Sequence, residues 1–182
     1  MKLLRLLSIV TFTLVTILTA QAQDKPRVSP QATVKANIDD ADITVVYSRP
    51  YTKDPKTGAP RKIWGGLVPF GKVWRTGANE ATVLTTTKAL DLGGTALPAG
   101  SYSLFTVPEE NGGKLIINKQ TGQWGTKYDE KQDLAKVDLT KAKADAPADQ
   151  FTITLDKNPA GGGTIKLIWE DAAYSVNFSV RK

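Results

Sequence analysis

Short stretches of alternating apolar and polar residues recur along most of the chain. The clearest covers residues 174–180, where tyrosine, valine and phenylalanine alternate with serine and asparagine. Alternation with a period of two is typical of a β-strand that buries one face. Similar stretches, rich in β-branched and aromatic residues, cover residues 32–38, 43–47, 81–87, 101–107, 114–118, 151–155 and 164–169. The pattern predicts about eight to ten antiparallel strands.

Turn-forming residues separate these stretches. Clusters of glycine, proline and asparagine occur at residues 93–94, 98–100, 111–113 and 158–163. No stretch has the 3.6-residue periodicity of an amphipathic helix. The charged residues 129–148 predict at most one helical turn, and residues 145–149 predict a linker between strands. We therefore expect an all-β fold, a single-domain antiparallel β-sandwich or squat barrel, with little helix beyond the N-terminal signal.

The first 22 residues have the features of a secretory signal peptide. Lys2 and Arg5 precede an apolar stretch, and the sequence Ala-Gln-Ala at residues 20–22 has the small-x-small pattern of a cleavage site. The apolar stretch is shorter than the roughly 20 residues that a helix needs to cross a bilayer. We expect cleavage near Ala22, a mature domain at residues 23–182, a periplasmic or secreted location, and no stable membrane insertion.

Composition excludes several kinds of chemistry. The chain has no histidine and no cysteine, so it forms no disulfide, no thiolate or imidazole zinc site and no Ser-His-Asp triad. The formal net charge of +6 falls to +4 once Lys2 and Arg5 are removed with the signal peptide. The remaining basic residues are interleaved with acidic ones and form no basic run, so we expect no nucleic-acid partner. We also expect no cofactor and no metal ligands.

Residues 48–79 interrupt the strand pattern. They contain five glycines and four prolines, and long irregular connections within compact domains are uncommon and often functional. Three arginines, Arg49, Arg61 and Arg75, lie in this segment, whereas the mature chain otherwise uses lysine for nearly all of its positive charge. Arginine presents a planar fork that pairs with carboxylate or phosphate groups and stacks on aromatic rings.

Four motifs in and after this segment carry a family resemblance. They are YSRP at residues 47–50, RKIWGGLVPFGKVWRTGANEAT at 61–82, LPAGSYSLFTVP at 97–108 and NKQTGQWG at 118–125. Their succession resembles the DUF2911 family, which implies an exported protein of unknown function found mainly in Bacteroidetes and relatives. The similarity runs from about Ser29 to the C-terminal strand. Residues 52–60 depart from the family as a local insertion, and the strand before Asn118 lacks the tryptophan that the family leads us to expect.

Two interpretations of the irregular segment stay open. It is either a binding surface for an anionic or polyhydroxylated small molecule or glycan, or a structural plug over one end of the fold. The candidate ligand-binding residues are Arg49, Arg61, Trp64, Trp74, Arg75, Asn79, Glu80 and Trp124. The plug would instead bury Trp64, Leu67, Val68, Phe70, Val73 and Trp74, with Arg49 or Arg75 paired to Glu80.

The sequence favours a non-catalytic ligand-binding or accessory module of the cell envelope. One alternative is a carboxylate-dependent glycan hydrolase, for which Glu80 is the one carboxylate in the motif and has no nominated partner. The other is a structural domain that binds a partner along an exposed sheet edge. The sequence assigns no catalytic residue and no oligomeric state.

Overall fold

The computed structural model describes residues 27–181, so the predicted signal peptide lies outside the described residues. Strands dominate this part of the chain, and its one short 3-10 turn is η1 (Glu130–Gln132). The strands are β1 (Gln31–Ile38), β2 (Ala41–Ser48), β3 (Thr82–Thr86), β4 (Leu90–Leu92), β5 (Thr95–Leu97), β6 (Gly100–Glu109), β7 (Gly112–Asn118), β8 (Asp133–Lys157) and β9 (Gly163–Val180). The prediction of an all-β fold is confirmed.

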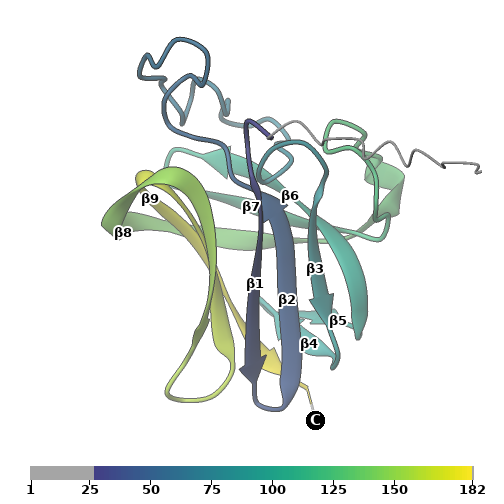
Figure 1. The fold of residues 1–182 in the computed structure, drawn as a ribbon. Helices are drawn as coiled ribbons and strands as arrows, with labels where there is room; N and C mark the ends of the chain where they lie inside the picture. Colours follow the sequence, from purple (N-terminus) through teal and green to yellow (C-terminus); the bar gives the residue numbers. More distant parts are fainter. Residues whose placement is uncertain (1–26, 182) are drawn as a thin grey trace, which may run out of the picture.

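These strands form one antiparallel sheet, shown in Figure 1. Their order across the sheet is β1-β2-β3-β6-β7-β8-β9-β4-β5. Most neighbours follow one another along the chain, whereas β9 returns to pair with β4, as in the partnership of Leu90 with Val180. The sheet is open, with β1 and β5 at its ends. The finer choice between a sandwich and a squat barrel stays a prediction.

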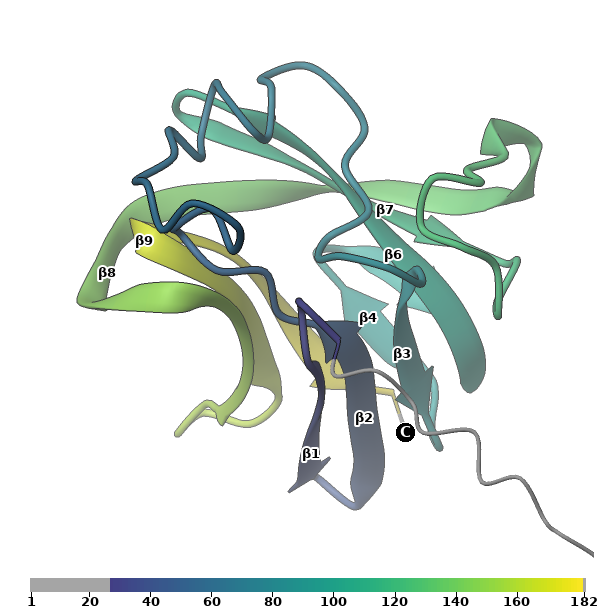
Figure 2. The same ribbon diagram turned by 45° about the horizontal axis from the view of Figure 1, so that its top comes forward.

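The long hairpin of β8 and β9 bends in the middle. Its register shifts between Lys143 and Ala148, and again between Ala148 and Thr152. Figures 1 and 2 show β8 curving sharply in this part of the hairpin. The prediction that residues 145–149 are a linker between strands is therefore wrong, because they lie inside β8. A register irregularity accommodates Pro147, which has no backbone N–H to donate, without ending the strand.

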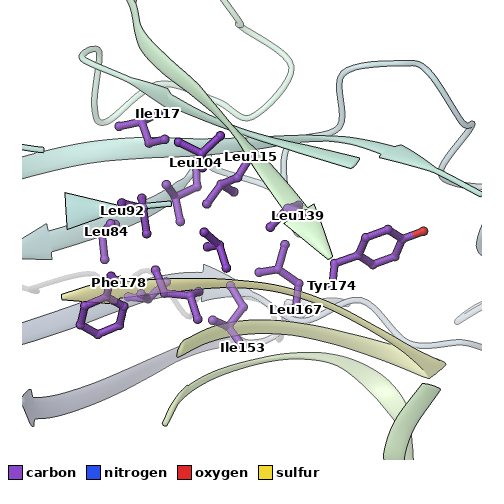
Figure 3. Close-up of a cluster of buried hydrophobic side chains, with 14 of the residues drawn as sticks. Leu84, Leu92, Leu104, Leu115, Ile117, Leu139, Ile153, Leu167, Tyr174 and Phe178 are labelled. Carbon is purple, nitrogen blue, oxygen red and sulfur yellow. The ribbon is translucent and has the colours of Figure 1, made fainter. Parts of the chain in front are cut away.

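The core lies between the parts of the sheet that the bend brings face to face. Figure 3 shows Leu104 and Leu115 on one side of the apolar cluster, with Ile153 and Leu167 on the other. All four side chains are buried. The alternation read from residues 174–180 is also confirmed, because its aromatic residues and Val176 are buried whereas the serines and asparagine between them are not. Apolar burial of this kind is the main favourable contribution to folding.

Two hairpin turns contact each other at the end of the fold away from the irregular segment. The backbone N–H of Gly162, between β8 and β9, donates a hydrogen bond to the Asp39 carboxylate between β1 and β2, at 2.6 Å. The ammonium group of Lys157 lies 3.7 Å from the other oxygen of the same carboxylate. Asp39 therefore links the hairpin of β1 and β2 to the hairpin of β8 and β9.

Candidate functional site

The chain leaves β2 by pairing with the bend of β8. The Arg49 guanidinium donates to the Phe151 carbonyl oxygen at 3.1 Å and to the Thr152 hydroxyl at 2.8 Å. Backbone hydrogen bonds from Phe151 to Pro50 and from Thr52 to β8 continue this pairing. The ladder between β8 and β9 is irregular here, so its polar groups need other partners. Arg49 thus supports the bend of β8.

The next part of the irregular segment is a plug with an exposed apolar surface. Figure 2 shows the segment crossing one end of the sheet after β2. Ile63 and Val68 are fully buried and belong to the main core. Leu67 and Val73, in contrast, are 48% and 44% exposed. The plug interpretation is therefore right for Val68 and wrong for Leu67 and Val73, which are exposed.

Trp64 and Trp74 join the plug to the aromatic core. The Trp74 ring stacks on Trp169 with a centroid distance of 5.9 Å and meets the edge of Phe151 at 4.9 Å. Trp64 lies 4.8 Å from the ring of Tyr174, and its indole N–H donates to the Trp169 carbonyl oxygen at 3.1 Å. Both indoles are half-buried. Aromatic pairs of this kind contribute about 0.5–1.5 kcal/mol each beyond their burial.

A tight turn follows Trp74. The backbone of Trp74 pairs with Thr106 of β6. Strand β3 pairs with the neighbouring residues of the same strand. Thr76 and Asn79 then adopt left-handed conformations, with φ of 52° and 58°. The Asn79 side-chain amide donates to the Ser29 carbonyl oxygen at 3.1 Å. Asn79 therefore fixes the N-terminal segment against this turn.

Glu80 pairs with an arginine outside the irregular segment. Its carboxylate lies 2.7 Å from the Arg27 guanidinium, and that hydrogen bond holds the pKa of Glu80 below its ordinary value. The expected pairing of Glu80 with Arg49 or Arg75 is wrong, since Arg49 is committed to β8. The side chains of Arg27 and Glu80 are 50% and 37% exposed, so their ion pair contributes little to stability.

A cavity of about 630 Å³ lies beside the plug. Three of the candidate residues, Arg61, Trp74 and Arg75, contribute to its wall. The described part of the chain has six exposed large apolar residues, and four of them also line this cavity. These four are Val28, Tyr51, Leu67 and Val73. Exposed apolar residues that gather at one place indicate an interaction site.

The two arginines of the cavity differ in their surroundings. Arg61 donates to the backbone carbonyl oxygens of Tyr51 and Thr52. Arg75 is half-buried and has no hydrogen-bond or ion-pair partner among residues 27–181. Its stem lies against the backbone of Gly125, where an added Cβ would come within 2.6 Å of the Arg75 Cδ atom. The absence of a side chain at Gly125 therefore leaves the space that Arg75 occupies.

Besides Tyr51, three aromatic residues that the sequence did not nominate belong to the wall. These are Phe105, Tyr128 and Trp169. The Tyr128 hydroxyl donates to Asp133 at 2.6 Å, and burial together with that carboxylate raises the pKa of Tyr128 above its ordinary value. The Trp169 indole nitrogen is buried without a hydrogen-bond partner among the described residues. Trp124, which the sequence nominated, does not line the cavity, although its neighbour Gly125 does.

The eight nominated residues therefore separate into two groups. Arg61, Trp74 and Arg75 meet at the cavity. The remaining five are placed elsewhere, and they are Arg49, Trp64, Asn79, Glu80 and Trp124. The first four of these five hold the plug, the N-terminal segment and the bend of β8 in place, and the Trp124 side chain is 49% exposed.

The family comparison covers nearly all of the described chain. A family described as a protein of unknown function, DUF2911, matches residues 29–178. The chain belongs to the DUF2911 family. The matched residues extend from just before β1 into β9 and include the plug, the turn after Trp74 and Arg75. No curated protein and no solved structure matches the chain.

A second hollow of this DUF2911 protein has balanced charges. Its wall contains Lys62, Lys141 and Lys143 together with three acidic residues, and its volume is about 660 Å³. The acidic residues are Glu110, Glu170 and Asp171. Within residues 27–181, acidic side chains form no group of three that could hold a metal ion. The same residues include no helix with the length and hydropathy that a membrane crossing requires.

Proposed function

We propose that this DUF2911 protein is a non-catalytic ligand-binding module of the cell envelope and that the cavity beside the plug is its site. A cavity of about 630 Å³ falls within the range of about 300–1,000 Å³ that small-molecule sites occupy. Its wall combines apolar and aromatic side chains with a few polar groups, which is typical of such sites. The location follows from the signal peptide predicted at residues 1–22.

Arg75 is the observation that carries this proposal. The Arg75 side chain is half-buried and has no partner among the described residues, and a charged group that loses part of its hydration gains from an opposite charge or from hydrogen-bond acceptors. The other motif arginine, Arg49, has such acceptors within the protein. A bound ligand would supply them to Arg75. The sequence suggests an anionic or polyhydroxylated small molecule as that ligand.

The alternatives receive less support. A glycan hydrolase needs a carboxylic acid whose pKa is raised, whereas the pKa of Glu80 is lowered by its pairing with Arg27. Partner binding along a sheet edge would use β1 or β5. However, β5 is only three residues long and β1 carries the exposed Lys35. Short edge strands and edge lysines are typical of sheets that are protected against pairing.

Binding of the neutral fluorophore N-phenylnaphthylamine to the mature protein tests the proposed site. We expect saturable binding with a stoichiometry of one. Leu67→Trp is expected to weaken it at least about fivefold, because Leu67 lines the cavity and a larger ring there would obstruct the space. Fluorescence titration measures both values.

Leu134→Trp is the matched control. Leu134 is also an exposed large apolar residue, 38% accessible on β8, but it does not line the cavity. Its replacement is expected to leave the affinity unchanged. Failure of the fluorophore to saturate, or equal effects of the two substitutions, would contradict the proposed site.

A further inference from the structure

We infer that the cavity selects an amphipathic organic anion, a small molecule with one carboxylate on an apolar body. This inference rests on the proposed function and specifies the ligand class of the same site. Three features carry it: the charge of the wall, the free donors within it, and the apolar character of the remaining surface.

The charge of the wall has one sign. Arg61 and Arg75 both line the cavity, and no aspartate, glutamate or lysine does. The second hollow has three lysines and three acidic residues, so its formal charges cancel. Charges that face a partly desolvated cavity interact more strongly than charges in bulk water. The cavity beside the plug therefore favours an anion, whereas the second hollow has no such preference.

The arginines retain donors for that anion. A guanidinium has five N–H groups in a fixed fork, and the carbonyl oxygens of Tyr51 and Thr52 receive donors from only the Nη2 and Nε atoms of Arg61. Arg75 has no partner among the described residues. Its stem packs against the backbone of Gly125. A carboxylate matches the fork of a guanidinium and forms charge-assisted hydrogen bonds with it.

Another donor without a partner belongs to the same wall. The Trp169 indole nitrogen is buried, and no described residue accepts its hydrogen. Buried polar groups in folded proteins almost always have a hydrogen-bond partner, and an exception needs an explanation. Of the residues that line the cavity, Arg75 and Trp169 are both donors left unpaired by the protein. That nitrogen is closed off from the cavity in this structure, so a ligand there would meet the donors of Arg75 and not the indole N–H of Trp169.

The larger part of the remaining wall is apolar. Val28, Leu67 and Val73 are exposed at the cavity, and the half-buried Trp74 adds aromatic surface. Four residues with hydroxyl groups also line the cavity, Ser29, Tyr51, Thr126 and Tyr128, and the Tyr128 hydroxyl already donates to Asp133. A polyhydroxylated ligand would lose hydration at each hydroxyl that finds no partner, which is unfavourable. An apolar body would instead remove both its own surface and the exposed side chains from water. The wall therefore fits an amphipathic anion better than a sugar.

Three probes of nearly equal shape test the charge preference in the unmodified mature protein. They are indoleacetate, its neutral amide indoleacetamide, and the cationic amine tryptamine. Affinities are measured by NMR from the indole N–H signals of the protein, with the Trp74 signal assigned by Trp74→Phe. We expect indoleacetate to bind at least about tenfold more tightly than the amide, because a hydrogen bond to a charged group adds about 1.5–3 kcal/mol. The amine is expected to bind most weakly.

Arg75→Gln then identifies the group responsible. This substitution is expected to remove most of the difference between the acid and the amide, because it lowers the affinity for the acid far more than the affinity for the amide. Arg181→Gln is the matched control, since Arg181 is exposed and lies outside the cavity, and it is expected to change neither affinity. Thermal unfolding of each variant checks that the fold is retained.

The outcomes separate the two proposals. Equal affinities for acid and amide in the unmodified protein, or acid binding that fails while the neutral fluorophore still binds, would overturn the anion preference and leave the proposed site standing. Equal effects of Arg75→Gln and Arg181→Gln would also overturn it. If neither the fluorophore nor any of the three probes binds, both the site and the ligand class are wrong.

Discussion

Replacing Trp169 with alanine is expected to lower the free energy of unfolding by about 3–5 kcal/mol, the usual cost of truncating a large buried aromatic side chain. Trp169 is 1% exposed and contacts the rings of Trp64, Trp74 and Phe151. Its loss would remove the surface on which both tryptophans of the plug pack. Urea denaturation followed by circular dichroism measures the change.

Trp124→Ala provides the control for that experiment. The Trp124 side chain is 49% exposed and makes no ring contact among the described residues, so its truncation is expected to change the free energy of unfolding by no more than about 0.5 kcal/mol. A loss for Trp169→Ala no larger than that of Trp124→Ala would mean that the plug is not packed on the core in this way. The account of the cavity wall would then fail as well.

Replacing Gly162 with alanine is expected to lower the free energy of unfolding by about 3 kcal/mol or more. Gly162 has a φ of 68°, in the left-handed region that favours glycine. An added Cβ would also lie 2.1 Å from the Phe178 carbonyl oxygen, a backbone atom that cannot rotate away. The change would disturb the hairpin of β8 and β9 and its hydrogen bond to Asp39. Chemical denaturation measures the loss.

Gly94→Ala separates the effect of the left-handed backbone from the effect of the steric clash with β9. Gly94 also has a left-handed conformation, with a φ of 83°, but nothing lies within 4 Å of the position that its Cβ would take. Only the conformational strain remains there, so a loss of about 1–2 kcal/mol is expected. Equal losses at the two positions would show that the close approach of Gly162 to β9 is not present.

The sequence predicted the strands that bury one face over several residues and missed those that do not. Residues 174–180 alternate cleanly and lie in β9 as expected. The first part of β8 was missed because its exposed positions carry charged residues and only Val137 and Leu139 are buried there. Strands β4 and β5 have three residues each, which is too short for an alternation to be recognised.

The sequence indicated the segment beside which the cavity lies, but it did not show which residues line the cavity. Of the residues that the concentration of arginine and tryptophan in one irregular segment singled out, Arg61, Trp74 and Arg75 line the cavity. Sequence reasoning could not separate Arg49 from Arg75, because the acceptors of Arg49 lie about a hundred residues away, on β8. Trp169 comes from β9 and completes the wall only through the fold. Long-range contacts of this kind depend on the bend of β8, which no local pattern indicates.

A crystal structure of the mature protein with indoleacetate tests the central claim most directly. We expect the ligand to occupy the cavity of about 630 Å³ beside the plug, with its carboxylate within hydrogen-bond distance of the Arg75 guanidinium and its ring against Trp74 and Leu67. An empty cavity in crystals that hold the ligand elsewhere would contradict this claim, as would a ligand in the cavity whose carboxylate points away from Arg75.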